Sequence, residues 1–488
     1  MTDGDDGGDD LRRATLRGVR WIAIGRVVTE TIALGSSVAL ARLVPPAEFG
    51  RAAVALIVVA LAAILGPAGI TAVLVQRREI GRSQLEATAF LALTAGVVFA
   101  LLTVGLAHIG APEVFGHGTA FLIGLAAPAW LLAAIGAVPQ ALLQRELAFR
   151  RVAIIDSISL LVGATVAVAL AAAGLDGTAI VIGAVATTAV ATAIAMISAP
   201  VPVPRPSARG IADVGGFAAS VSASSLVYTV FRNVDYAILG ARLQPASVGY
   251  YWRAYQLGID YQGKISQIML RVAFPVYSRA EGLDELRRLR RKIVRTHAAV
   301  IIPLMGVFIA TAPELITRVY GAKWEPAVRP AQIMAVAGMA YAIATGTGPL
   351  MVAVGKPNAL LAWSVCELVF YAILVGLLTP HGLVAVSIGV AAFAVASLLV
   401  IQTFLLRPYL GLPVRGLVDD ILPGVVSGAG VLGTLLLLRL ALEHDVPAIF
   451  LIAVLAAAGA TVYVVLLRVL FAQEWSDLTS LLGRVSGR

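Results

Sequence analysis

Long apolar runs without charge are the feature that most constrains the fold of this chain. Residues 52–75 contain no charged side chain, and similar runs recur as far as the C-terminus. An α-helix of about 20 apolar residues crosses the roughly 30 Å hydrocarbon core of a bilayer and satisfies its own backbone polar groups. Of the 488 residues, 59% are hydrophobic and 13% are charged, whereas soluble domains carry about 25% charged residues. The sequence therefore predicts an all-α polytopic membrane protein.

Hydropathy predicts fourteen transmembrane helices. The first half of the chain supplies six, at 19–43, 49–70, 87–108, 119–141, 153–173 and 177–197. The second half supplies six more, at 214–241, 247–275, 297–317, 328–353, 358–378 and 383–406. Two further spans, at 420–441 and 447–470, have no counterpart in the first half.

Two short patterns recur at matching places in the two halves. Ala-Arg-Leu followed by Pro and Gly occurs in residues 41–50 and again in residues 241–249. Gly-Leu followed by Ala and Ile-Gly occurs in residues 174–183 and again in residues 382–389. The repeat length of six helices is even, so both halves begin on the same side of the membrane. We therefore expect two six-helix bundles related by a pseudo-twofold axis along the membrane normal, an arrangement typical of transporters with a substrate site between the halves.

These features predict the following domain organisation. Residues 1–17 form a disordered acidic and basic N-terminus, 18–200 the N-terminal bundle, 201–212 a proline-rich linker, 213–408 the C-terminal bundle, 409–472 two extra transmembrane helices and 473–488 a cytoplasmic tail. The linker is assigned because prolines at alternate positions after residue 201 disfavour both helix and sheet.

Basic loops set the expected orientation, because Lys and Arg concentrate on the cytoplasmic side of membrane proteins. They precede the first span and follow the even-numbered spans, whereas residues 108–118 and 174–177 contain neither. Both termini are therefore predicted to be cytoplasmic. The loop after the ninth span, with Arg318, Lys323 and Arg329, does not fit this pattern. The loops account for the formal net charge of +9, so no nucleic-acid partner is expected.

Other sequence features bound the chemistry further. Residues 281–296 are predicted to form an amphipathic helix that lies at the anionic cytoplasmic leaflet. The single Cys366 excludes an internal disulfide. The five histidines are expected in loops or at helix ends and lack metal-ligand spacing, so neither a metal nor a cofactor is expected.

Charged residues gather on one face of the eighth predicted span. At 100° per residue, Asp260, Lys264 and Arg271 each fall within about 20° of the direction of Arg253. A charge at the bilayer centre costs roughly 2.5–3.5 kcal/mol, so such a stripe is not expected to face lipid. It should line a wet cavity or pair with charges on a neighbouring helix.

The first and seventh spans supply further candidates for the cavity. These are Arg26 and Glu30 in the first span and Arg232, Asn233 and Asp235 in the seventh. Guanidinium groups bind phosphate with two parallel hydrogen bonds and stay charged, so this interior suits a substrate that bears pyrophosphate. A structural alternative remains open, because the Arg26–Glu30 and Asp260–Lys264 pairs are four residues apart and could neutralise each other.

Two carboxylates stand alone on apolar helices. Asp156 and Glu367 are candidates either for a proton or cation site or for hydrogen bonds that hold helices together.

Five stretches give the chain a family resemblance. They are residues 41–50, 69–78, 144–151 with Asp156, 233–240 with 249–254, and 274–278 with 320–326. In this order they resemble the Wzx-type polysaccharide flippases, which serve O-antigen, exopolysaccharide or teichuronic acid synthesis in the PST branch of the MOP exporter superfamily. The resemblance covers residues 18–410, which is most of the chain.

The resemblance implies a function and a set of partners. A flippase of this kind moves undecaprenyl-pyrophosphate-linked oligosaccharide repeat units from the cytoplasmic to the outer leaflet of the bacterial inner membrane, by alternating access of two bundles, and is not an enzyme. Besides this lipid-linked oligosaccharide, the implied partners are membrane lipids, a coupling proton or sodium ion and the polysaccharide polymerase machinery.

Three alternative functions remain. A flippase of a lipid-linked peptidoglycan precursor would also have fourteen helices. A MATE-like antiporter would have twelve, with a cavity centred on carboxylates. A membrane polysaccharide polymerase or ligase would need a large external loop, which this sequence does not predict.

Overall fold

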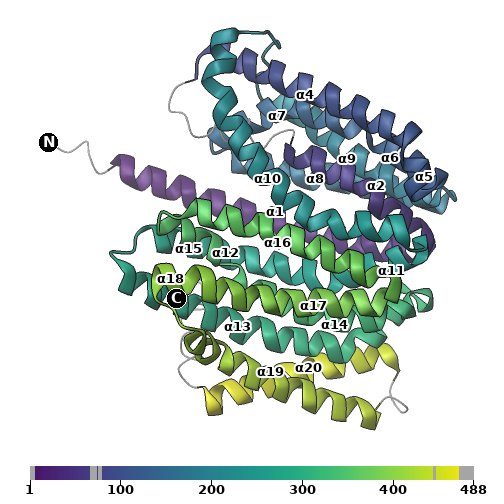
Figure 1. The fold of residues 1–488 in the computed structure, drawn as a ribbon, viewed down its shortest axis with the longest axis vertical. Coiled ribbons are helices and arrows are strands. Elements are labelled where there is room, and N and C mark those ends of the chain that lie inside the picture. Colours follow the sequence, from purple (N-terminus) through teal and green to yellow (C-terminus); the bar gives the residue numbers. More distant parts are fainter. Residues whose placement is uncertain (1–5, 66–73, 75–79, 443–446, 472–488) are drawn as a thin grey trace. The chain divides into compact units, whose positions relative to one another are not determined.

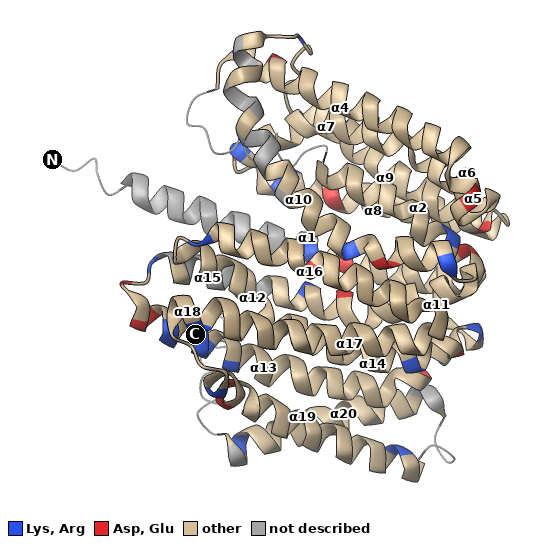
Figure 2. Cartoon of the chain, viewed as in Figure 1, with Lys and Arg blue, Asp and Glu red and all other residues tan. Residues whose placement is uncertain are grey.

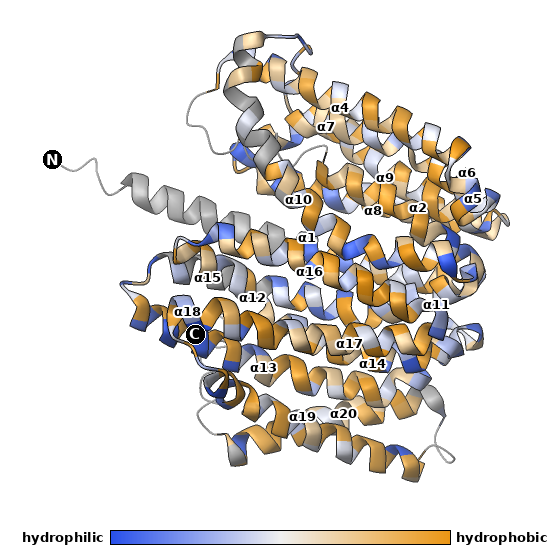
Figure 3. Ribbon diagram, in the orientation of Figure 1, coloured by the Kyte–Doolittle hydropathy of each residue, from blue (hydrophilic) through white to orange (hydrophobic). Residues whose placement is uncertain are grey.

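The computed structural model describes residues 6–65, 74, 80–442 and 447–471 (Figure 1). Within these ranges the chain forms helices joined by short turns, with no β-strand. Figure 3 shows that the helices are hydrophobic along most of their length. The predicted all-α polytopic membrane protein is confirmed.

Every predicted span coincides with helical structure where its residues are described; residues 66–70 of the second span lie outside the described residues. Twelve helices of the described residues are long and apolar enough to cross a membrane. The seventh predicted span corresponds to α10 (Ala208–Arg242). The eighth corresponds to α11 (Pro245–Tyr255), the π-helical turn η1 (Gln256–Asp260) and α12 (Tyr261–Ser278). Neither is among the twelve, and the side chains of both are described only in part, so the count of fourteen crossings stays a prediction.

Contacts between residues divide the chain into two compact units, Met1–Gly249 (unit 1) and Tyr250–Arg488 (unit 2). The other helices of unit 1 are α1 (Asp6–Leu43), α2 (Pro46–Leu65), α4 (Arg82–Ile109), α5 (Ala111–Phe115), α6 (His117–Ala126), α7 (Pro128–Arg145), α8 (Phe149–Ala172) and α9 (Asp176–Ser198). Helix α8 packs along both α1 and α9. Small residues make this packing close: a Cβ atom on Gly163 of α8 would lie 2.6 Å from the carbonyl oxygen of Gly183 of α9. Such small-residue contacts are typical of helix pairs in membranes.

The two copies of the Ala-Arg-Leu repeat meet within unit 1. A Cβ atom on Gly50, in α2, would lie 1.8 Å from the carbonyl oxygen of Pro245. Reciprocally, a Cβ atom on Gly249 would lie 1.9 Å from the carbonyl oxygen of Pro46. The two glycines therefore occupy equivalent places in a contact that only glycine allows, as a twofold relation between the copies requires.

The proline-rich segment after α9 packs on unit 1. The backbone N–H of Arg205 donates to the carbonyl oxygen of Glu86 at 3.3 Å. Val201, Pro202 and Pro204 line a small apolar cavity with residues of α4 and α7. Helix α10, which follows, packs against α2 and α4. The proline-rich segment attaches the start of α10 to unit 1, and the repeat contact attaches the chain that follows its end. Helix α10 therefore groups with unit 1, and the division by contacts comes after Gly249 rather than at 201–212.

Helix α1 begins at Asp6, within the segment 1–17 that was expected to be disordered.

Unit 2 is built around α13 (Leu283–Glu314), which packs against α14 (Val328–Ala344), α19 (Val414–Leu442) and α20 (Ala448–Leu470). Its remaining elements are the π-helical η2 (Leu315–Tyr320), η3 (Ala322–Ala327), α15 (Thr347–Ala353), α16 (Pro357–Leu378), η4 (Thr379–His381), α17 (Leu383–Val400), the π-helical η5 (Ile401–Leu406) and α18 (Arg407–Leu410).

The amphipathic helix predicted at 281–296 is present as the first half of the longer helix α13, from Leu283 onward. Its apolar face packs on protein, because Leu286 belongs to a buried cluster with Met351 and Leu410. The hydrophobic periodicity of the segment reflects burial within unit 2.

Candidate functional site

An exposed charged cluster lies on α1 and α8 of unit 1. Arg26 Nη2 lies 3.0 Å from Glu30 Oε1, and the two side chains are 50% and 31% exposed. Helix α8 approaches α1 closely at Gly25, where a Cβ atom would lie 2.8 Å from Ala153 Cβ. One turn further along α8, the exposed Asp156 lies within electrostatic reach of Arg26. Two acids and one arginine therefore share one surface of apolar helices, and Asp156 is not isolated as the sequence had indicated.

The three candidates on α10 have different surroundings. Asn233 Nδ2 donates to the carbonyl oxygen of Thr229 at 2.8 Å, which ties the amide to its own helix. Asp235 is fully buried, and its Oδ1 accepts the backbone N–H of Tyr236 at 2.9 Å. Arg232 is half-buried. Of the three, Arg232 is the cation, so it is the one whose chemistry suits a phosphate ligand.

The predicted stripe of the eighth span assumed an unbroken α-helix, but the π-helical turn η1 interrupts it. A π turn takes up about one extra residue, so the faces before and after it are rotated by about 100° relative to a straight helix. The turn lies where α14 comes very close, since a Cβ atom on Gly258 would lie 2.9 Å from the backbone nitrogen of Ala335. Arg253 therefore does not share a face with Lys264.

Arg253 is enclosed by aromatic rings within unit 2. Its side chain is fully buried, and its Cζ atom lies 4.3 Å from the ring centroid of Tyr320, 4.8 Å from that of Trp324 and 5.2 Å from that of Trp252. Its Nη1 donates to Gln256 Oε1 at 2.7 Å. A buried guanidinium over aromatic faces gains about 2 kcal/mol or more. This geometry fits a residue that holds α11 to η2 and η3.

The charges after the π turn are less enclosed. Asp260 and Lys264 are half-buried, and Lys264 Nζ lies 4.8 Å from the ring centroid of Tyr261. Arg271 belongs to α12, but its side chain lies outside the described residues. Of the predicted stripe, Asp260 and Lys264 are thus the described side chains that are not fully buried.

A buried polar group on α12 and α13 was missed. Ser266 Oγ lies 3.0 Å from Gln262 Oε1 and 3.1 Å from His297 Nε2. A hydroxyl has one proton, so when Ser266 donates to Gln262, His297 donates to Ser266 from Nε2. The histidine was expected at a helix end but lies inside α13, where it joins the two helices.

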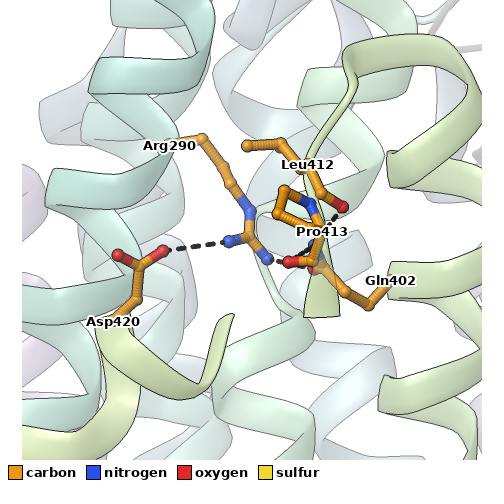
Figure 4. A network of polar contacts seen from close by, with 5 residues as sticks. All are labelled: Arg290, Gln402, Leu412, Pro413 and Asp420. Carbon is orange, nitrogen blue, oxygen red and sulfur yellow. Dashed lines mark hydrogen bonds and ion pairs between the residues drawn. The ribbon is translucent and has the colours of Figure 1, made fainter. Parts of the chain in front are cut away.

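A second buried network, shown in Figure 4, joins α13 to η5 and α19. Arg290 Nη2 donates to Gln402 Oε1 at 2.9 Å, and Arg290 Nη1 lies 3.5 Å from Asp420 Oδ2. Gln402 Nε2 in turn donates to the carbonyl oxygen of Leu412 at 2.9 Å. Arg290 and Asp420 are 4% and 3% exposed.

The sequence did contain a signal for this network. Arg290 lies four residues after Leu286 and four before Val294, and both of these are buried. It therefore occupies the apolar face of α13 rather than the face with the other arginines.

Other polar pairs hold the helices of unit 2 together. Near the opposite end of α13, Glu314 Oε1 lies 2.9 Å from Arg439 Nη2 of α19. Glu367 of α16 accepts a hydrogen bond from Ser397 of α17, as the helix-packing interpretation of this carboxylate expects. No group of three His, Cys, Asp or Glu side chains that could hold a metal ion occurs in the part of the chain that the structure describes.

The profile of a family described as polysaccharide biosynthesis protein matches residues 39–329, more than half of the chain. The chain belongs to this family. The resemblance to Wzx-type flippases drawn from the sequence is thereby confirmed. The chain is 24% identical over 410 residues to the lipopolysaccharide biosynthesis protein WzxC of Escherichia coli (strain K12), covering 82% of each chain. It is also 24% identical over 482 residues to the teichuronic acid biosynthesis protein TuaB of Bacillus subtilis (strain 168), covering 96% of this chain and 98% of that one.

Solved structures share the fold of this family member. The lipid II flippase MurJ in an inward closed conformation matches with a TM-score of 0.77 at 14% identity, over 96% of this chain and 99% of that one. An inward-facing multidrug resistance MATE transporter of the MOP superfamily matches with a TM-score of 0.61 at 13% identity, over 78% of this chain and 96% of that one. The MOP-type fold is therefore confirmed.

Proposed function

We propose that this protein flips a polyprenyl-pyrophosphate-linked oligosaccharide from the cytoplasmic to the outer leaflet of the bacterial inner membrane. Alternating access of the two predicted bundles carries the sugar and pyrophosphate through a wet route, while the polyprenyl chain stays in lipid. The protein performs no covalent step. Family membership and the names of the relatives support this substrate class.

The observation that carries the proposal is the exposed cluster on α1 and α8. Arg26 is half exposed on a helix that is apolar enough to span a membrane. A charge facing hydrocarbon costs roughly 2.5–3.5 kcal/mol on insertion scales. Arg26, Glu30 and Asp156 are therefore assigned to a surface that meets water during transport.

Roles follow from the surroundings of each side chain. Arg26, Arg232 and Lys264 are the cations proposed to contact the pyrophosphate, with Arg271 as a further candidate from the sequence. Glu30 and Asp260 hold these cations in place between transport events. Asn233, Asp235 and Arg253 are proposed to position helices around the route, since their polar atoms are engaged or enclosed within their own units.

The remaining partners and the orientation are part of the same proposal. Both termini lie in the cytoplasm, as the basic loops predict. A proton or sodium ion supplies the energy, and Asp156, which is exposed on α8, is the carboxylate best placed to exchange it. The flipped lipid is passed to the polysaccharide polymerase machinery.

Deletion of the protein tests the proposal in cells. The undecaprenyl-linked oligosaccharide should then accumulate on the cytoplasmic leaflet, where a membrane-impermeant sugar label does not reach it in intact cells. Re-expression of the native chain should restore labelling, and an Arg26→Gln, Lys264→Gln chain that inserts normally should not. An accumulated lipid that is fully labelled in intact deletion cells would contradict the proposal.

A flippase of a lipid-linked peptidoglycan precursor is the second candidate. It is favoured by the match to MurJ over nearly the whole length of both chains. At 14% identity this match shows the fold alone, whereas the polysaccharide relatives match in sequence. Rescue of cells depleted of their own lipid II flippase would favour this second function.

A further inference from the structure

One tyrosine is exposed near the middle of a helix that is predicted to cross the membrane. Tyr228 of α10 lies near the centre of the predicted span 214–241, and 59% of its side chain is exposed. Tyrosines of membrane proteins are enriched at the two membrane–water interfaces, where the hydroxyl meets water. Anchoring at the headgroups therefore does not account for the position of Tyr228.

The hydroxyl group distinguishes Tyr228 from the other exposed rings. Among the described side chains, the other exposed aromatic residues are phenylalanines, which suit contact with lipid: Phe99, Phe121, Phe370, Phe404 and Phe450. The Tyr228 hydroxyl has no hydrogen-bond partner within the described ranges. A hydroxyl that faced hydrocarbon would have no acceptor at all, which is costly. The ring therefore fits a surface that meets water.

Two polar side chains share the face of Tyr228. Ser225 precedes it by three residues and Arg232 follows it by four, so at 100° per residue the three side chains fall within about 60° of one another. Ser225 and Arg232 are half-buried. At about 1.5 Å per residue, the serine hydroxyl, the ring and the guanidinium follow one another over roughly 10 Å of helix. This face, defined by Ser225, Tyr228 and Arg232, offers three kinds of contact in a fixed order.

This order matches the chemistry of a glycosylated pyrophosphate. The first sugar is bonded directly to the pyrophosphate, so a guanidinium on the phosphates and a ring on that sugar must be close neighbours, as one helical turn provides. The C–H face of a sugar packs on the electron-rich face of an aromatic ring, and a serine hydroxyl can donate to or accept from the sugar hydroxyls. Most of the helix length is uncharged in Figure 2, so a cation one turn from an exposed ring sets this face apart.

We infer that Tyr228 stacks on the first sugar of the lipid-linked oligosaccharide, while Arg232 contacts the pyrophosphate and Ser225 pairs with sugar hydroxyls. This inference rests on the proposed function and extends it, because it assigns recognition of the sugar, and not of the pyrophosphate alone, to α10. The ring selects glycosylated lipid over the sugar-free polyprenyl pyrophosphate.

Binding of lipids to the full-length protein in nanodiscs tests this selection. The probes are undecaprenyl pyrophosphate without sugar, with one glucose and with one galactose. The native chain should bind at least one of the hexose-bearing lipids roughly fivefold more tightly than the sugar-free lipid. Tyr228→Ala should bind all three equally, with unchanged affinity for the sugar-free lipid, whereas Tyr228→Phe should keep the native preference. The matched control Leu226→Ala, at an exposed apolar position on another face of α10, should keep it too.

Thiol labelling tests separately whether this face meets water. Cys366 is the single native cysteine, so a Cys366→Ala chain serves as the background. Tyr228→Cys should react with a membrane-impermeant methanethiosulfonate, because the reagent attacks the thiolate, which forms in water and not in lipid. Phe370→Cys, with similar exposure near the middle of α16, should not react.

The outcomes separate this inference from the proposed function. Equal affinity of the native chain for the three lipids, or a preference that persists in Tyr228→Ala, would overturn the role of Tyr228 and leave the flippase in place. An unreactive Tyr228→Cys would assign the ring to lipid, with the same consequence. Failure of the native chain to bind any of the three lipids would overturn the proposed function and this inference together.

Discussion

Asp420→Asn should destabilise unit 2 far more than the same change at the neighbouring Asp419. Asp420 is 3% exposed and is the acid that faces the buried Arg290, whereas Asp419 is exposed. Asparagine has nearly the same shape as aspartate, so the substitution removes the charge and leaves the packing intact. The two variants therefore isolate the contribution of a buried charge.

The expected magnitude follows from the burial of the pair. Removing one partner of a buried ion pair leaves an uncompensated charge and costs about 3–5 kcal/mol. The lower end applies here, because Gln402 still accepts a hydrogen bond from Arg290 and the ion-pair distance is long, at 3.5 Å. We expect a loss of about 3 kcal/mol for Asp420→Asn and of at most about 0.5 kcal/mol for Asp419→Asn.

Thermal unfolding of the purified protein, followed by intrinsic fluorescence, measures this difference. A unit of this size loses roughly 2–4 °C in Tm per kcal/mol, so Asp420→Asn should lower the Tm by roughly 6–12 °C. The double variant Arg290→Gln, Asp420→Asn should lose less than the sum of the two single variants, since the residues share one network. Equal Tm values for the Asp419 and Asp420 variants would refute the reasoning.

Four further substitutions separate packing from transport. Gly50→Ala places a Cβ atom 1.8 Å from a backbone oxygen and should lower the free energy of unfolding by about 3 kcal/mol. In the control Gly105→Ala, in α4, the new Cβ atom meets no atom within 4 Å, so the Tm should be unchanged or slightly higher. Equal Tm values for the two variants would contradict the close contact of the repeats. Arg253→Gln should lower thermal stability by about 2 kcal/mol through loss of the ring cage, and an unchanged Tm would show that the cage contributes nothing. Lys264→Gln should keep the Tm within about 1 °C, since substitutions at partly exposed positions change stability by about 0.5 kcal/mol or less. The same variant should lower the amount of surface polysaccharide in complemented deletion cells. A normal amount of surface polysaccharide would show that this lysine does not line the transport route.

The sequence predicted the helices well because each must bury about 20 apolar residues in lipid. It also identified the repeats, since the Ala-Arg-Leu pattern marks the glycines that meet in unit 1. It did not reveal that they touch, because a pattern along the chain carries no distance. Hydropathy could not show that α10 groups with unit 1, which depends on where the segment before it packs.

The candidate site was predicted less completely, for two physical reasons. The stripe on the eighth span was computed for a uniform helix, and the π turn at 256–260 rotates Arg253 away from Lys264. The network around Arg290 joins residues more than a hundred positions apart in sequence. Only its position on the apolar face of α13 indicated that this arginine is buried.

Flipping by the purified protein in liposomes tests the central claim most directly. Liposomes with undecaprenyl-pyrophosphate oligosaccharide in both leaflets are treated with an impermeant enzyme that cleaves the exposed glycan. The native chain should render nearly all of the lipid accessible, and the Arg26→Gln, Lys264→Gln chain should leave about half protected, as in protein-free liposomes. Half protection with the native chain, or equal accessibility with both chains, would contradict the account.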